Sequence, residues 1–87
     1  MPEEDQAVTI LKELTLCMAQ AVVTHPNQVR IEVTEGVSVI ILELEVDPED
    51  VGRVIGKGGK VATAMRILLR TSAARMGKRV NLEMIHT

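Results

Sequence analysis

Three glycines within four residues, Gly56, Gly58 and Gly59, constrain the fold of this chain more than any other feature. They separate two segments whose apolar residues recur at helical spacing, so the sequence predicts a sharp turn between two helices. Missing side chains let a sugar-phosphate backbone approach closely, and the following helix presents unpaired N–H groups. Lys57 and Lys60 add positive charge there. The pattern favours a phosphate-binding turn; the simpler alternative is a helix cap with a flexible hinge.

The apolar pattern on either side predicts an α+β fold in the order helix, strand, strand, helix, helix, strand (αββααβ). Amphipathic periodicity indicates helices at about 4–23, 48–55 and 60–76. Alternation and β-branched residues indicate strands at 29–34, 37–46 and 80–85. Asp47 and Pro48 are a strong helix start, because aspartate caps free N–H groups and proline tolerates the first helical position. We therefore expect one domain over 1–87, with helices packed on one face of a three-stranded sheet.

The predicted core is aliphatic, since the chain contains no Phe, Trp or Tyr. RRM and OB folds stack bases on aromatic rings, so both are disfavoured. The last helix should bury the face that carries Val61, Met65, Leu68, Leu69 and Met76. Ile67 and Ala74 fall outside this face and are candidate dimer contacts, although exposed surface residues are the simpler interpretation. We expect the single cysteine, Cys17, to be a small buried residue of the first helix.

Charge is divided unevenly along the chain. Residues 1–50 hold eleven acids and two bases, whereas residues 51–87 hold eight bases and one acid. This division predicts a basic region built by the C-terminal part, or merely two separate solvated faces. Arg53, Arg66 and Arg70 occupy helical positions that could flank a nucleic-acid groove, and solvated positions are an equal alternative for each.

The stretch Val54-Ile55-Gly56-Lys57-Gly58-Gly59-Lys60-Val61 resembles the I-G-x-x-G signature of KH domains. The predicted element order is similar to the type II, prokaryotic KH fold, which has a three-stranded mixed sheet. The longer stretch 47–60 closely resembles the small bacterial single-KH proteins of the KhpA type, and the likeness extends over essentially the whole chain. A bare GxxG is weak evidence, but its position between two helices after a hairpin makes the resemblance specific.

The resemblance implies that the loop clamps about four nucleotides of single-stranded RNA. On the matching positions, Gly56, Lys57, Gly58, Gly59 and Lys60 would hold phosphates and sugars. Val54, Ile55 and Val61 would form the aliphatic floor of the base groove, and Ile41 its wall. The family further implies an RNA chaperone or post-transcriptional regulator that acts as a homodimer or with a larger Jag-type KH protein. Single-stranded DNA remains an alternative ligand.

Two other classes of function are alternatives to RNA binding. An enzyme is disfavoured, because no register of residues 52–60 supplies a P-loop and Val61 stands where G-x-G-x-x-G needs its last glycine. His25 and His86 have no evident nucleophile or metal ligand beside them, so we expect no cofactor. A protein-interaction adaptor with weak or partner-dependent RNA binding is the main alternative. The acidic N-terminus is unlike a signal peptide, and no apolar run suits a membrane span, so we expect a cytoplasmic protein.

Overall fold

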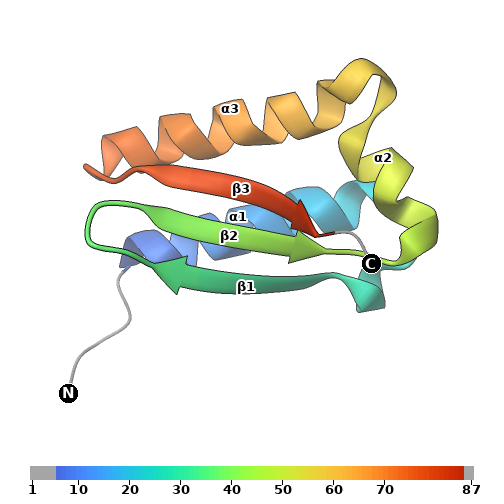
Figure 1. Ribbon diagram of the computed structural model, residues 1–87, viewed down its shortest axis with the longest axis horizontal. Helices are drawn as coiled ribbons and strands as arrows, with labels where there is room; N and C mark the ends of the chain where they lie inside the picture. Colours follow the sequence, from blue (N-terminus) through green and yellow to red (C-terminus); the bar gives the residue numbers. More distant parts are fainter. Residues whose placement is uncertain (1–5, 86–87) are drawn as a thin grey trace.

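The computed structural model describes residues 6–85, and the expectations for residues 1–5 and His86 lie outside this range. Its elements are α1 (Gln6–Val22), β1 (Arg30–Glu35), β2 (Ile40–Glu45), α2 (Val51–Ile55), α3 (Lys60–Arg75) and β3 (Val80–Ile85), with short 3-10 turns before β1, α2 and α3. The predicted αββααβ order is therefore confirmed (Figure 1). No helix among these elements is long and apolar enough to cross a membrane.

The sheet is mixed, as the type II resemblance implies. Strand β2 lies in the centre, antiparallel to β1 and parallel to β3, so β3 is an edge strand. The hairpin differs from the prediction, because β2 begins at Ile40 and not at Val37. Val37 is fully exposed at the tip, where the Gly36 N–H donates to the Val39 carbonyl over 2.8 Å.

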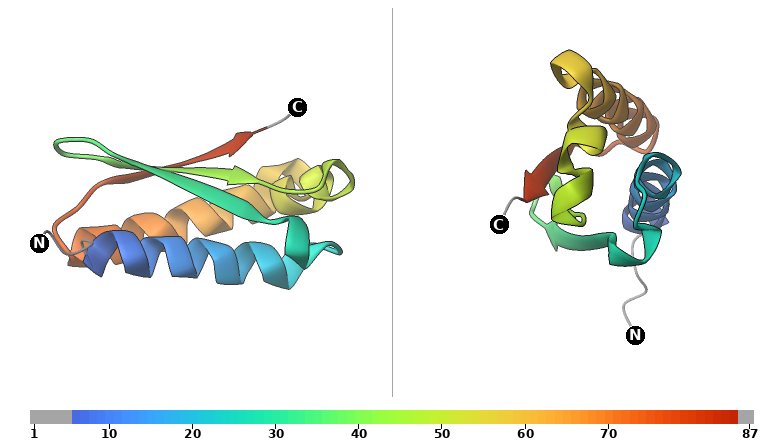
Figure 2. Two further views of the ribbon diagram at one scale, coloured as in Figure 1. Left: turned by 90° about the horizontal axis from the view of Figure 1, so that it is seen from below. Right: turned by 90° about the vertical axis from the view of Figure 1, so that its right-hand side faces the viewer.

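Two long helices, α1 and α3, run antiparallel and cover one face of the sheet (Figure 2). The short α2 lies at one end, between the start of α3 and the ends of β2 and β3 (Figure 1). The alternation predicted for β2 is confirmed, since its residues 40, 42 and 44 are buried against the helices. Between helices and sheet lies an aliphatic core whose most buried members are Leu11, Ile40, Leu42, Leu44, Val54 and Leu69.

Two expectations about buried helix faces were wrong. Cys17 is exposed, because the buried face of α1 runs through Leu11, Thr15 and Ala19, and position 17 points about 200° away from position 15. Leu68 is 46% exposed, because the buried face of α3 is centred on Leu69 and completed by the small residues Ala62 and Ala73. Small side chains allow α3 to lie close to its neighbours. The predicted face was wrong because it was centred on the large apolar residues alone.

The other face of the sheet is open and acidic. Glu32, Glu43 and Glu83 are direct cross-strand partners, so one glutamate from each strand forms a row across the sheet. Like charges at this spacing repel one another and also repel a phosphate backbone. Polyanions are therefore directed away from this face of the sheet.

Candidate nucleic-acid interface

Gly56 ends α2 in a conformation that only glycine adopts readily. Its φ is 80° and its ψ 169°, and its N–H donates to the Gly52 carbonyl over 2.8 Å. A Cβ at this position would lie 2.4 Å from Cγ2 of Val61, closer than any real contact. The first glycine of the loop is therefore required by backbone geometry and by close packing on the first turn of α3.

The next two glycines differ, because they face open space. Gly58 and Gly59 have φ of 64° and 76°, and a Cβ at either would meet no atom within 4 Å. The Gly59 N–H donates to the Gly56 carbonyl over 3.0 Å, which closes the turn. Lys57 and Lys60 are exposed on either side. The loop thus presents bare backbone between two lysines, immediately before the N-terminus of α3.

A small apolar pocket lies beneath α2, at the ends of β2 and β3. It is lined by Leu44, Val46, Val51, Val54, Ile55, Met84 and Ile85. Two residues predicted for the groove floor, Val54 and Ile55, meet here, whereas Val61 packs under Gly56.

Sequence reasoning missed Met84 and Ile85, which reach this pocket because β3 runs parallel to β2 and ends at α2. The expectation that Ile41 forms a wall of the groove was wrong. Ile41 alternates with the buried residues of β2 and pairs with Asn81, so it lies on the open face.

The three arginines singled out from helical spacing lie in three different environments. Arg66 is half-buried, and its Nε donates to the Leu82 carbonyl of β3 over 3.2 Å, so its guanidinium sits between α3 and the edge strand. Arg70 is exposed one turn further along α3, beside a polar cleft. Arg53 is turned back toward the start of α2, because its Nη1 lies 3.3 Å from the Glu49 carbonyl and 3.5 Å from Asp50 Oδ1.

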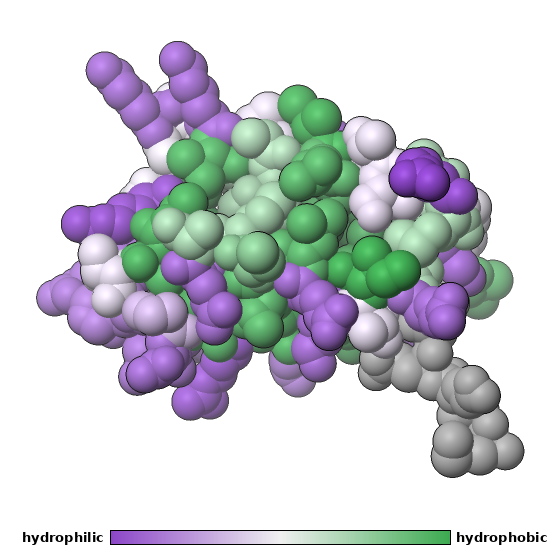
Figure 3. Space-filling model, turned by 180° about the vertical axis from the view of Figure 1, so that it is seen from behind, coloured by the Kyte–Doolittle hydropathy of each residue, from purple (hydrophilic) through white to green (hydrophobic). Residues whose placement is uncertain are grey.

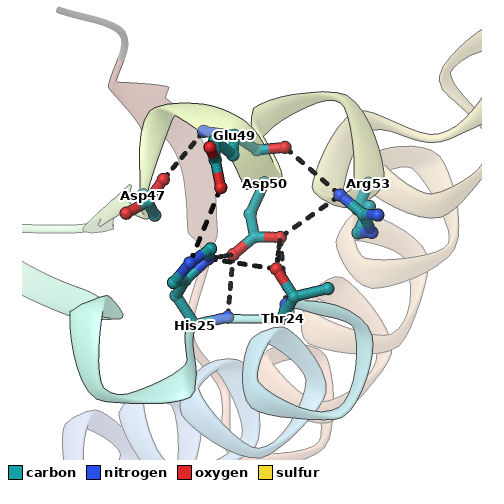
Figure 4. A network of polar contacts seen from close by, with 6 residues as sticks. All are labelled: Thr24, His25, Asp47, Glu49, Asp50 and Arg53. Atoms are coloured by element: carbon teal, nitrogen blue, oxygen red, sulfur yellow. Dashed lines mark hydrogen bonds and ion pairs between the residues drawn. The ribbon is translucent and has the colours of Figure 1, made fainter.

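Asp50 is the centre of a polar network that joins the end of α1 to the start of α2 (Figure 4). Its side chain is fully buried. Oδ1 accepts from the backbone N–H and the hydroxyl of Thr24, each over 2.9 Å, and Oδ2 accepts from the His25 N–H over 3.0 Å. His25 Nδ1 lies 3.1 Å from Oδ2. Sequence reasoning did not predict this network: it used residues 47–50 only as a helix start and looked beside His25 only for a nucleophile or a metal ligand.

These contacts shift the pKa of both groups. Burial alone would raise the pKa of Asp50, but the hydrogen bonds from Thr24 and His25 outweigh it and lower the pKa to about 2. The hydrogen bond to Asp50 raises the pKa of His25 above its usual 6.5, against a smaller effect of burial, and the carboxylates of Asp47 and Glu49 add to the rise. The charged pair is therefore favoured in the folded protein.

One group of potential metal ligands lies beside this network. His25, Asp47 and Glu49 each offer an atom within 4.8 Å of the others. Asp47 already accepts from the Glu49 N–H over 2.9 Å as a helix cap, as predicted, and Glu49 lies 3.6 Å from His25 Nε2. Because internal contacts use these groups, we assign them no ligand.

Comparison with known proteins identifies the family of this chain. A model of the KhpA/KhpB KH domain matches residues 12–84. The chain belongs to this family. Its relatives include proteins named RNA-binding protein KhpA from Treponema pallidum (44% identical, covering 90% of this chain and 98% of the relative), Clostridium acetobutylicum (41%, covering 86% and 100%) and Aquifex aeolicus (37%, covering 90% and 99%).

Solved structures show the same fold within a larger protein. Aquifex aeolicus Era bound to GDP·AlF4− superposes with a TM-score of 0.66 at 20% identity, over 94% of this KH domain and 31% of the Era chain. Era in complex with MgGDPNP and nucleotides 1506–1542 of 16S ribosomal RNA gives 0.63 at 22% identity, over 85% and 28%. At this identity the likeness establishes the KH fold alone.

The two kinds of glycine around α2 predict opposite effects of an added methyl group. Gly56→Ala should lower the free energy of unfolding by at least about 2 kcal/mol, because it combines an unfavourable φ with the Val61 contact. Gly52→Ala should raise it by about 0.5–1 kcal/mol, since Gly52 is helical and its Cβ would be in open space. Urea denaturation measures both. Equal effects would contradict the assigned role of Gly56.

The Asp50–His25 pair predicts a pH window of greatest stability. The lowered pKa of Asp50 stabilises the fold above about pH 4, and this contribution is lost as the pH falls toward 2. The raised pKa of His25 stabilises it below about pH 6.5, and this is lost as the pH rises through the folded-state value. Thermal denaturation of the wild type and of Asp50→Asn should differ by at least about 5 °C in Tm inside this window.

The matched variant His25→Gln separates the acid limit of this pH window, set by Asp50, from the alkaline limit, set by His25. It should abolish the fall in stability on the alkaline side and leave the acid side intact, because Asp50 keeps its bonds to Thr24 and to the backbone N–H of residue 25. A Tm difference between the wild type and Asp50→Asn that does not change with pH would show that the pair is not charged in the fold.

Proposed function

We propose that this KH domain binds single-stranded RNA at the loop of residues 56–60. The observation that carries the proposal is the open backbone of Gly58 and Gly59 between the exposed Lys57 and Lys60. A sugar-phosphate chain can approach this backbone to hydrogen-bonding distance, which a side chain at either glycine would prevent. The name RNA-binding protein KhpA, carried by relatives about 40% identical, supports RNA as the ligand.

Bases of the bound strand would lie against the aliphatic side chains near α2, where Val51, Ile55 and Met84 line the apolar pocket. Arg66 would border them from α3, and Arg53 would support α2 through Asp50 instead of touching RNA. Phosphate contacts carry little sequence information, so selectivity should be modest. Such a clamp suits an RNA chaperone or post-transcriptional regulator, a role that requires no reacting group.

Gly58→Asp tests the clamp directly. It places a carboxylate where the phosphate should lie, and Asp tolerates positive φ better than most residues. Binding of a fluorescent tetranucleotide RNA pool should weaken at least tenfold. Gly77→Asp is the matched control, because Gly77 has φ of 71° and an equally open Cβ position beyond the far end of α3. Titration by fluorescence anisotropy at two salt concentrations measures both, and circular dichroism checks folding.

Equal affinity of the two variants would contradict the clamp. A wild-type chain that fails to bind any RNA unless a partner protein is added would support the adaptor alternative. Repeating the titration with the DNA tetranucleotide pool shows whether the loop senses the 2′-hydroxyl, since phosphate contacts alone would bind both.

We also propose that a second copy of the chain covers the surface formed by α1 and α3. Ile10 and Leu68 are 45% and 46% exposed there and line a shallow apolar groove between the two helices, beside Leu14 and Met76. Ile67, which precedes Leu68 on α3, is 58% exposed. Figure 3 shows a hydrophobic area across this side of the molecule, bordered by hydrophilic side chains. A two-fold contact would bury the same side chains of both copies. Ala74 lies instead in the polar cleft beside Arg70.

Ile67→Asp should shift the protein toward the monomer, because it buries an unpaired charge in the proposed contact. Val37→Asp is the control, with the same change at the fully exposed hairpin tip. Light scattering should show a dimer for the wild type and the control at about 50 µM. An unchanged mass of Ile67→Asp would refute the contact. A monomeric wild type that pairs only with a Jag-type KH protein would favour the heterodimer.

A further inference from the structure

A polar cleft lies between the C-terminal half of α3 and the start of β3, at the opposite end of α3 from the glycine loop. Arg70 and Ala74 line it from α3, and Lys78, Arg79 and Asn81 line it from the following turn and strand. No acidic side chain of residues 6–85 lines this cleft. Three of the eight bases that follow residue 50 therefore converge on a surface that the loop clamp does not use.

The backbone holds this basic surface in place. Gly77, with φ of 71°, ends α3, and the Lys78 N–H donates to the Ala73 carbonyl over 2.9 Å. The Arg79 carbonyl accepts from the Ile40 N–H over 2.8 Å, which ties the start of β3 to the central strand. Lys78 and Arg79 therefore follow the helix at fixed backbone positions, and Glu35 of the hairpin lines a neighbouring cleft together with them.

Basic residues follow α3 from the glycine loop to this cleft. Arg66 lies at the seam between α3 and β3, and Arg70 follows one turn later on the same side of the helix. Arg70 is ten residues beyond Lys60, or about 15 Å along the helix axis. A stacked strand advances about 3.4 Å per nucleotide, so four nucleotides cover about 14 Å. A strand that leaves the clamp along this seam would reach the cleft at about its fifth nucleotide.

We infer that Arg70, Lys78 and Arg79 form a second phosphate-binding segment, which holds RNA nucleotides beyond the four in the loop clamp. The inference rests on the proposed RNA clamp and extends its length. It makes the footprint of this small domain longer than that of the loop, so RNA of eight or more nucleotides should bind more tightly than a tetranucleotide. The acidic open face of the sheet leaves the α3–β3 side as the favourable path.

The test compares a triple variant, Arg70→Gln/Lys78→Gln/Arg79→Gln, with the control Lys12→Gln/Arg30→Gln/Arg75→Gln. Both remove three positive charges, and the control residues are exposed outside the cleft. Fluorescent tetranucleotide and decanucleotide RNA pools are titrated with each protein. The cleft variant should lose roughly tenfold affinity for the decanucleotide, and its log–log salt slope should fall by about 2, as expected for three single-strand phosphate contacts. Its tetranucleotide affinity should match that of the control.

Equal losses by the cleft variant and the control would overturn the inference, since they would reflect net charge alone. Equal losses for both RNA lengths would overturn it as well, because the cleft would then act on the clamp itself. Failure of the clamp is a separate result: it appears as unchanged tetranucleotide binding by Gly58→Asp, a variant in which all three cleft residues are intact.

Discussion

The buried Asp50 carboxylate holds the glycine loop in position. Helix α2 contains only five residues, too few to be stable alone, and the glycine loop is attached to its end. Asp50 fixes the start of α2 by accepting hydrogen bonds from the backbone of residues 24 and 25, which follow α1. These bonds link segments about 25 positions apart in the chain. The position of the loop therefore depends on the contact between the end of α1 and the start of α2.

The fold places acidic and basic side chains on two different sides of the domain. The central row of glutamates makes the open face of the sheet repulsive to polyanions. The loop lysines, Arg66 and the cleft residues follow α3 and the edge strand β3 on the other side. A net charge of −2 is therefore compatible with RNA binding, because the potential along one path matters more than the sum.

Sequence reasoning predicted the element order and the glycine turn because both depend on local signals. Periodicity locates helices and strands, and positive φ at Gly56, Gly58 and Gly59 is a local demand that glycine meets. It could not predict the partners of Asp50, which lie far away in sequence and use backbone N–H groups that every residue has. The place of Met84 in the pocket depends on the parallel pairing of β3 with β2, which only the assembled sheet determines.

The most direct test of the central claim is paramagnetic relaxation enhancement from a tetranucleotide RNA that carries a nitroxide at one end, measured on the backbone amides of the protein. If the strand is clamped at the loop, the amides of Gly58, Gly59 and Lys60 should broaden most, and those of the open sheet face, such as Glu43, should broaden much less. Strongest broadening on the open face or along α1, with the loop amides unchanged, would contradict the account.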